Sequence, residues 1–404
     1  MSSIVKNNMK ILAIESSCDD TSIAFIEVNE VTQVVTVLSH ITSSQADLHT
    51  QYGGVFPMIA KREHAKNIVP LLKQVLIESN EYTETPQTID AKLITDIPMI
   101  DVGMAQDLCS FLQNAEIPKI DYICVTYGPG LEMSLWVGVN FATALSNVWS
   151  LPLVPVNHME GHIYSISANG QKEFPLHQFT YPYLSLLISG GHTQLVLAPN
   201  KDEYKIIGNT KDDAVGEAFD KVARMIDLPY PGGPAISKIA KSAREQGLTS
   251  WVTLPRPMMH SSDMDFSFSG IKTAVMYAIE KKVAESGPLT EQDKMVLAME
   301  FENAVTEVIV KKLFKAVDEY QIEEISVAGG VAANTYIQEQ IKKHIGKEGY
   351  GVRVFFPDRS VTGDNALMIA LVGYKNIQEI ISENKKTPVA IKANGSLALS
   401  LGDK

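Results

Sequence analysis

The sequence predicts an α/β protein made of a duplicated unit, with two lobes and a nucleotide site in the cleft between them. Three stretches lead to this prediction. An apolar strand runs into a small polar turn and out into another apolar strand at residues 11–26, and the same design returns at residues 183–197. The third stretch is a strand followed by Gly329-Gly330 and the start of a helix. Related units far apart in one chain indicate duplication, and ligands commonly bind between such halves.

The turn Ser189-Gly190-Gly191 is the most informative part of the second unit. Glycines lack a Cβ atom, so their main-chain N–H groups can approach a phosphate closely. An ordinary β-hairpin looks the same, and for this stretch alone both interpretations stay open. Together, the three stretches resemble the nucleotide cleft of the actin, sugar-kinase and Hsp70 superfamily. That resemblance implies a fold and not a function.

We expect the 404 residues to divide as follows: a short extension at 1–8, a first lobe at 9–157, a crossover with a helix at 158–182, a second lobe at 183–373 and a tail at 374–404. Residues 79–107 are polar, contain prolines and lack periodicity, which predicts a surface insertion in the first lobe.

Helical spacing predicts helices in both lobes, four of which are the following. The first covers residues 59–75, and its polar face should carry Lys61, Arg62, His64 and Lys66. In the second lobe, a helix follows Asp212-Asp213 and an amphipathic helix covers residues 291–318. Between these two lies a basic helix with Lys238, Lys241 and Arg244. Residues 256–270 are rich in proline and serine, so we expect a loop there.

The amino-acid composition and net charge exclude several classes of protein. No apolar run approaches the roughly 20 residues that span a bilayer, so we expect no membrane segment. Three cysteines are too few and too scattered for a disulfide framework. The formal net charge is −12, so a nucleic-acid partner would need a local basic patch or a helper protein. Residues 1–8 carry Lys6 and no acid, which is compatible with a very short organellar presequence.

His158-Met-Glu-Gly-His162 is the sharpest chemical signal, and Asn157 directly before it is a candidate helix cap. Histidines four residues apart on a helix point the same way, so both imidazoles can reach one metal ion. Two unrelated helical histidines would have the same spacing, and that interpretation stays open. The motif does not fit a metalloprotease helix, because that pattern needs glutamate directly after the first histidine.

A third ligand could come from Asp364, in a Gly-containing loop. Two histidines and one aspartate suit iron(II), zinc or manganese and leave positions open for a substrate. Alternatively, Asp364 could cap the helix expected at residues 365–374, and the two roles are compatible.

Asp19 and Asp20 lie in the first polar turn. Carboxylates near phosphates need a metal or a proton-transfer role, although they could also simply stabilise the turn. Asn334, after the glycine pair, could read an adenine or a ribose, or could cap the following helix.

Eight motifs in order along the chain resemble the TsaD/Kae/Qri family of tRNA N6-adenosine threonylcarbamoyltransferases, once described as O-sialoglycoprotein endopeptidases. The motifs are Ile14-Glu-Ser-Ser-Cys-Asp-Asp-Thr21, Gly128-Pro-Gly-Leu131, His158-Met-Glu-Gly-His162, Ser189-Gly-Gly-His-Thr-Gln194, Gly216-Glu-Ala-Phe-Asp-Lys221, Tyr230-Pro-Gly-Gly-Pro234, Phe266-Ser-Phe-Ser-Gly270 and Ala328-Gly-Gly-Val331. His192 resembles the bacterial and organellar branch, since the archaeal and cytosolic branch usually has asparagine there. The residues before Met9 and the insertion favour a mitochondrial member, with a bacterial-type cytoplasm as the alternative.

The resemblance implies a reaction and a set of site residues. The threonylcarbamoyl group of threonylcarbamoyl-adenylate passes to N6 of adenosine 37 in tRNAs that read codons beginning with A. His158, His162 and Asp364 would hold one divalent metal ion per subunit. Asp19 and Asp20 lie in the turn that would help the acceptor amine attack. The adenylate, or ATP or AMP in its place, would be bound by Leu187, Ile188, Ser189, Gly190, Gly191, Asp220, Gly233, Ser237 and Asn334. A separate synthase would supply the adenylate, and the organellar members imply a homodimer.

Three alternative functions from other classes of protein can be compared with this one. A small-molecule kinase of the same superfamily would release ADP and would not need the histidine pair. A metalloprotease lacks its glutamate at position 159, where the chain has methionine. A chaperone-like ATPase would usually append a peptide-binding domain, and none is visible in the sequence.

Overall fold

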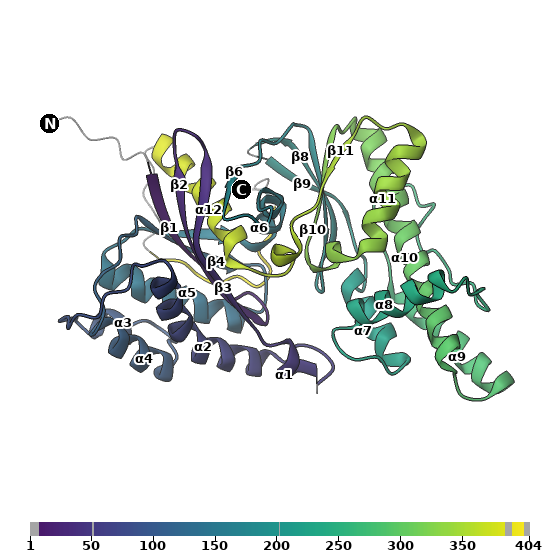
Figure 1. The fold of residues 1–404 in the computed structure, drawn as a ribbon, viewed down its shortest axis with the longest axis horizontal. Coiled ribbons are helices and arrows are strands. Elements are labelled where there is room, and N and C mark those ends of the chain that lie inside the picture. Colours follow the sequence, from purple (N-terminus) through teal and green to yellow (C-terminus); the bar gives the residue numbers. More distant parts are fainter. Residues whose placement is uncertain (1–7, 51, 202, 384–389, 400–404) are drawn as a thin grey trace. The chain divides into compact units, whose positions relative to one another are not determined.

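The computed structural model describes residues 8–50, 52–201, 203–383 and 390–399 (Figure 1). These residues form two units, each organised around one sheet. The first unit contains the described residues up to Leu48, together with Val55–Gln178 and Pro357–Ala398. The second contains the described residues of His49–Gly54 and Phe179–Phe356, and Leu399.

The two sheets repeat one topology, which confirms the predicted duplication. In the first, β1–β2–β3 pair antiparallel, β4 lies parallel to β1, and β5 lies parallel to β4. In the second, β7–β8–β9 pair antiparallel, β10 lies parallel to β7, and β11 lies parallel to β10. The strands are β1 (Asn8–Glu15), β2 (Asp20–Asn29), β3 (Val34–Ser44), β4 (Tyr122–Gly128), β5 (Leu153–Asn157), β6 (Glu173–Pro175), β7 (Tyr183–Ile188), β8 (Thr193–Asn200), β9 (Glu203–Asn209), β10 (Glu324–Ala328) and β11 (Arg353–Phe355).

Helices cover both faces of the first sheet, which explains why β1 reads as an almost continuous apolar run. Alternate side chains of a strand point to opposite faces. Leu12 and Ile14 pack into the cluster formed with α2 and α5, whereas Ile11 and Ala13 pack into the cluster formed with α12. The helices of this unit are α2 (Pro57–Glu78), α3 (Lys92–Thr95), α4 (Val102–Leu112), α5 (Glu132–Trp149), α6 (His158–Tyr164) and α12 (Ala366–Ser382). The short helix α1 (Ala46–Thr50) precedes α2.

The second unit has one large apolar cluster, in which β7 and β8 pack against α7 and α10. Helix α10 begins at a capping box in which Thr290 and Asp293 each bond the other's main chain. Phe219 of α7 and Phe301 of α10 meet edge to face with ring centroids 5.0 Å apart. The helices of this unit are α7 (Val215–Met225), α8 (Gly232–Glu245), α9 (Ser269–Ser286), α10 (Glu291–Tyr320) and α11 (Thr335–Glu348).

The four predicted helices are confirmed as α2, α7, α8 and α10, and most of residues 256–270 forms a loop. Helix α9, whose apolar pattern is weak, was not predicted. The placement of His64 on a polar face of α2 is wrong. His64 is buried, and its ring nitrogens contact the Thr21 hydroxyl at 2.7 Å and the Cys18 carbonyl at 3.0 Å.

The insertion predicted at residues 79–107 is not merely a surface excursion. It contains α3 and the start of α4, and the Asp101 side chain caps α4 by accepting from Met104 N. Ile94 and Met104 are buried in the core cluster of the first unit. Short helices of this kind carry too few residues to display a clear period in the sequence.

The chain returns to the first unit after residue 356, although the second lobe was expected to continue to residue 373. Helix α12 packs on β1, β2 and β5, as Figure 1 shows for the yellow helix beside the purple strands. It also continues through Tyr374 and Ile377, both buried, where the tail was expected to begin. The described residues 390–398 lie against the Gly128–Gly130 loop, since Asn394 N donates to Tyr127 O and Gly130 N donates to Gly395 O. Residues 1–7, 384–389 and 400–404 of the expected extension and tail lie outside the described residues.

Candidate functional site

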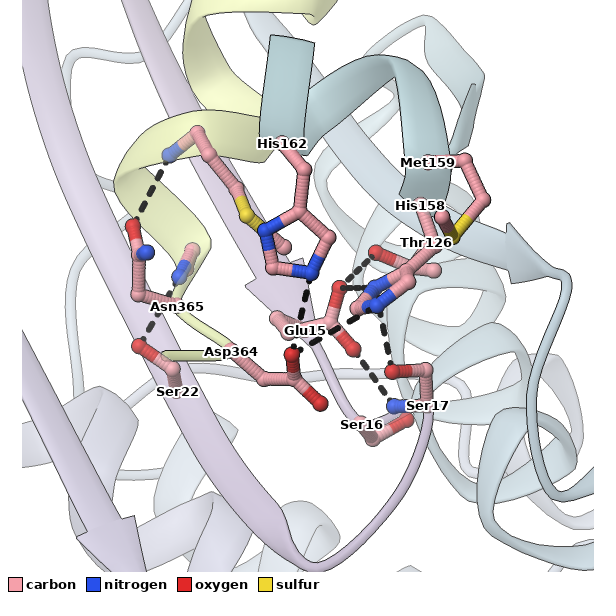
Figure 2. A network of polar contacts seen from close by, with 12 residues as sticks. Glu15, Ser16, Ser17, Ser22, Thr126, His158, Met159, His162, Asp364 and Asn365 are labelled. Carbon is pink, nitrogen blue, oxygen red and sulfur yellow. Dashed lines mark hydrogen bonds and ion pairs between the residues drawn. The ribbon is translucent and has the colours of Figure 1, made fainter. Parts of the chain in front are cut away.

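The histidine pair lies at the start of α6, directly after β5 ends. Asn157 caps this helix, as its position in the sequence predicts, because its side chain accepts from Met159 N and Glu160 N. The cap fixes the first turn, so His158 and His162 project toward the same side of the helix (Figure 2). Their ring centroids are 4.7 Å apart, with the rings nearly perpendicular.

Asp364 reaches the same point from the loop before α12. Its Oδ1 lies 3.5 Å from His158 Nε2 and 3.3 Å from His162 Nε2. The alternative that Asp364 caps α12 is wrong, because Asn365 is the cap and accepts from Met368 N. Asn365 therefore leaves the Asp364 carboxylate to face the histidines. One ligand atom from each of the three side chains lies within 4.8 Å of the others.

The surroundings of His162 fit a bound cation. The side chain is 1% exposed, and among the described residues neither of its ring nitrogens has a hydrogen-bond partner. Buried polar atoms of this kind are costly unless something else satisfies them. Two imidazoles and a carboxylate form a donor set suited to a divalent transition metal.

Helices α6 and α12 are held together beside this cluster by a largely buried ion pair. Lys375 Nζ of α12 donates to Glu160 Oε1 of α6 at 2.7 Å. On the other side, Ala366 N at the start of α12 donates to Ser22 Oγ of β2 at 2.9 Å. The two histidines and Asp364 are therefore attached to elements that are fixed to each other.

Glu15 lies behind His158, and the sequence reasoning gave it no role. Its side chain is fully buried, and its Oε2 lies 3.1 Å from His158 Nδ1. Burial favours neutral imidazole, but the negative charges of Asp364 and Glu15 raise the pKa of His158 to about 9. Burial likewise raises the pKa of Glu15, but the charge and hydrogen bond of His158 bring it below its ordinary value. A carboxylate at the end of an otherwise apolar strand was the signal available in the sequence.

Asp19 lies in the turn between β1 and β2, and Asp20 is the first residue of β2. Burial, with the charges of Asp364, Asp19 and Glu15, raises the pKa of Asp20 to about 7 against an opposing hydrogen bond from Ser44. Among the described residues, Asp20 Oδ1 has no hydrogen-bond partner. A carboxyl group that titrates near neutral pH is suited to accept or give a proton.

In the second unit, residues 189–192 form the turn between β7 and β8. His192 N donates to Ser189 Oγ, and Ser189 N donates to His192 O. A Cβ atom at Gly190 or Gly191 would meet no atom within 4 Å, so the turn has an open face. The side chains of Leu187 and Ile188 are buried in the sheet, so only their main chain could contact a ligand.

Two other segments of the second unit pack closely against this turn. A Cβ atom at Gly216 would lie 2.6 Å from Ser189 O, and one at Gly329 would lie 2.5 Å from Ile188 O. Gly216 N donates to Ser189 O at 3.2 Å. The motif glycines at 216 and 329 therefore allow the start of α7 and the end of β10 to reach the turn.

The other residues expected to bind the adenylate fall into two groups. Asp220 Oδ1 accepts from Gly232 N at 2.6 Å, and a Cβ atom at the adjacent Gly233 would meet nothing within 4 Å. Ser237 and Asn334 are joined, because Asn334 Nδ2 lies 2.9 Å from Ser237 Oγ. Asn334 also caps α11 by accepting from Ile337 N, so the capping interpretation is confirmed.

Glu302 holds Ser237 and Asn334 together, and the sequence reasoning missed it. This fully buried carboxylate accepts from Ser237 Oγ at 2.7 Å and from Asn334 Nδ2 at 2.8 Å. It lies on the buried face of α10 with Phe301 and Val305, and a charged residue within an apolar stripe was the available signal.

Arg244 does not join the basic surface that was expected on α8. Its guanidinium donates to Glu302 at 2.6 Å and to Asn303 at 2.7 Å, and it stacks 3.4 Å from the centre of the Tyr336 ring. Lys238 and Lys241 are exposed. The basic face of α8 therefore consists of two lysines, and the inclusion of Arg244 in it is wrong.

Comparison with known proteins identifies the family. The family model described as TsaD, tRNA N6-adenosine threonylcarbamoyltransferase, matches residues 36–98 and 105–371. The chain belongs to the TsaD family. A tRNA N6-adenosine threonylcarbamoyltransferase of Persephonella marina is 37% identical over 374 residues, covering 92% of this chain and 91% of the relative. One from Thermosipho africanus is 38% identical over 381 residues, covering 93% of this chain and 97% of the relative.

Solved structures agree on the fold of this TsaD-family chain. Full-length HypF, crystallised in a phosphate- and nucleotide-bound form, is 10% identical with a TM-score of 0.52. The likeness covers 92% of this chain and 47% of HypF, so the chain spans about half the length of that protein. At this identity the likeness shows the fold alone, and it confirms the two-lobed α/β architecture.

Proposed function

We propose that this chain forms threonylcarbamoyladenosine in tRNA. It transfers the threonylcarbamoyl group of threonylcarbamoyl-adenylate to N6 of adenosine 37 in tRNAs that read codons beginning with A, and it releases AMP. The observation that carries the proposal is the meeting of His158, His162 and Asp364 at one point in a chain of the TsaD family. The relatives from Persephonella marina and Thermosipho africanus bear the name of this activity.

In this proposal His158, His162 and Asp364 hold one divalent ion of iron, zinc or manganese. When bound, such an ion polarises or positions an oxygen of the transferred group. The open main chain of Ser189-Gly190-Gly191 takes the phosphate of the adenylate. Asp220, Gly233, Ser237 and Asn334 take its nucleoside part, with Leu187 and Ile188 contributing main chain only. Both ends of the Asn334 amide are already engaged, because its oxygen accepts from Ile337 N and its NH2 donates to Glu302.

The protein must align the two reactants in the chemical step, because the acyl group is already activated. The acyl group arrives as a mixed anhydride, so the N6 amine attacks its carbonyl carbon, a C–N bond forms, and the C–O bond to AMP breaks. The amine loses one proton in this step. Asp20 is our candidate acceptor, since its pKa near 7 leaves it partly ionised at neutral pH. Asp19, on the same turn, contributes negative charge that raises the pKa of Asp20.

The proposal extends to partners and compartment. A separate synthase supplies the adenylate, and the chain acts as a homodimer, as the resemblance to organellar members implies. A mitochondrial location rests on the residues before Met9 and on the insertion, and a bacterial-type cytoplasm is its alternative. The relatives described above are bacterial, and no helix among the described residues is long and apolar enough to cross a bilayer. Fractionation of the source cells, with light scattering of the purified protein, tests these points.

A reconstitution tests the central proposal. The protein is incubated with ATP, threonine, bicarbonate, an adenylate-forming synthase and unmodified tRNA, and the nucleosides are analysed by mass spectrometry. We expect threonylcarbamoyladenosine and AMP, and neither product of transfer when the synthase is omitted. The double variant His158→Ala/His162→Ala should form no product while its circular dichroism stays native. Release of ADP with a phosphorylated small acceptor, and no modified nucleoside, would instead indicate a kinase.

A further inference from the structure

We propose that Glu15 is a positioning residue that sets the tautomer of His158, and thereby makes its Nε2 a metal ligand. The inference rests on the metal site of the proposed function and assigns a role to a residue outside that site. Figure 2 shows that Glu15 and Asp364 both contact the His158 ring. Nδ1 of the ring faces Glu15, and Nε2 faces Asp364.

The hydrogen bonds around Glu15 allow only one arrangement of protons. Ser17 N–H donates to Oε1 at 2.5 Å, and the Thr126 hydroxyl donates to Oε2 at 2.5 Å. His158 Nδ1 lies 3.1 Å from the same Oε2. An ionised carboxylate can only accept, so Nδ1 must carry a proton. A metal that binds this ring must displace the proton on Nε2, and the one remaining N–H then stays at Nδ1, facing Glu15.

Ser17 completes the arrangement without competing with it. Its hydroxyl lies 3.1 Å from the same Nδ1, and because a hydroxyl can accept as well as donate, it is compatible with a protonated Nδ1. Glu15, Ser17 and Thr126 come from β1, the turn after it, and β4, which pair in one sheet. The support of His158 is therefore built into the sheet itself. Outer partners of this kind orient a ligating histidine and raise its basicity.

The variant Glu15→Gln reverses this arrangement with almost no change of shape. Ser17 N–H can only donate, so the amide oxygen must take the place of Oε1, and the amide NH2 then occupies the place of Oε2. That NH2 donates to His158 Nδ1, which moves the imidazole proton to Nε2 and blocks the ligand atom. The Thr126 hydroxyl can rotate to accept from the same NH2.

Calorimetric titration with zinc chloride tests the inference on the purified full-length protein. We expect Glu15→Gln to bind zinc about 10- to 100-fold more weakly than wild type, as is usual for loss of an outer partner. Thr126→Val is the matched control, because it removes a hydrogen bond to the same carboxylate but leaves Nδ1 facing an acceptor. Its zinc affinity should stay close to wild type. Equal affinity of wild type and Glu15→Gln, or an equal loss in both variants, would overturn the assignment.

A second measurement needs no variant and guards against a Glu15→Gln protein that fails to fold. Long-range ¹H–¹⁵N spectra of the zinc-loaded wild-type protein report which His158 nitrogen carries the proton. We expect a protonated Nδ1 and a ligated Nε2, and the reverse assignment would overturn the inference. A wild-type protein that binds no zinc, iron or manganese would refute the metal site itself and this inference with it. Normal metal binding with a protonated Nε2 would refute only the role of Glu15.

Discussion

His162 is a side chain whose contribution to stability should change sign with metal. Its ring nitrogens are buried without hydrogen-bond partners among the described residues, and an unsatisfied buried polar group costs about 1–3 kcal/mol. We predict that His162→Leu unfolds at the same or higher urea concentration than wild type in EDTA. With zinc at 100 times its dissociation constant, wild type should gain about 2.7 kcal/mol and the variant much less. A variant that is less stable in EDTA would show that His162 has a structural role of its own.

A substitution at Gly190 tests whether the Ser189-Gly190-Gly191 turn binds phosphate. Because a Cβ atom there meets nothing within 4 Å, Gly190→Val should fold with its thermal midpoint close to wild type. Its branched side chain would nevertheless occupy the open face where a phosphate must approach. We predict loss of binding to a non-hydrolysable adenylate analogue, measured by calorimetry. Gly216→Val is the contrasting variant, since its Cβ would meet Ser189 O at 2.6 Å and should lower stability itself. Wild-type affinity in Gly190→Val would refute the turn as a phosphate site.

The contact between α6 and α12 depends on the Lys375–Glu160 pair. Removing one partner of a buried pair leaves the other charge uncompensated, which costs about 3–5 kcal/mol. We predict that Lys375→Met lowers the free energy of unfolding by about 3 kcal/mol, and that adding Glu160→Gln restores most of it. Urea denaturation of the two single variants and the double variant measures the coupling. Additive losses would mean that the pair does not act as a unit.

Strand β3 carries a histidine that should make the fold sensitive to acid. Burial lowers the pKa of His40 from 6.5 to about 4, so the folded state resists a proton that the unfolded chain accepts. Stability should therefore be lost as pH falls from about 6.5 to about 4, by an amount on the order of 3 kcal/mol. His40→Gln should flatten this part of the profile, as measured by urea denaturation across the pH range. An unchanged profile would place the acid sensitivity elsewhere.

Prediction from the sequence succeeded where a structural feature depends only on residues that are close together in the chain. Asn157 before the helical histidines, and the helix over residues 59–75, followed from capping and periodicity alone. Asp364 was named from the sequence as a candidate third ligand, but no local pattern could show that it meets the histidines, because that contact depends on how α12 packs on β1 and β2. Glu15 and Glu302 were missed for a related reason, since each acts through partners distant in the sequence. Helix α9 was not predicted because most of its side chains are not buried, so apolar residues do not recur at helical spacing in its sequence.

For the chain as a whole, electrostatics should govern tRNA binding. With a net charge of −12, affinity must come from local cations, and Lys238 and Lys241 remain exposed on α8. We predict that Lys238→Glu/Lys241→Glu weakens tRNA binding and reduces the salt slope by about 0.7–0.9 for each phosphate that is no longer neutralised. Lys281→Glu/Lys347→Glu makes the same change in net charge at other exposed lysines and is the control. Filter binding across a salt series measures the affinity and the salt slope of each variant. Identical losses of affinity in both double variants would mean that the effect comes from net charge and not from the position of the lysines.

The return of residues 357–398 to the first unit also has a consequence for biosynthesis. Strand β1 leaves the ribosome long before α12, so the side of it that carries Ile11 and Ala13 waits for α12 to be translated. During that interval the nascent chain exposes an apolar surface that a holdase can bind. The second unit, by contrast, can fold as soon as β11 has emerged. Asp364 is translated after both histidines, so the three ligands come together only once the chain has been made as far as α12, and a translation product truncated before Asp364 could not assemble the centre.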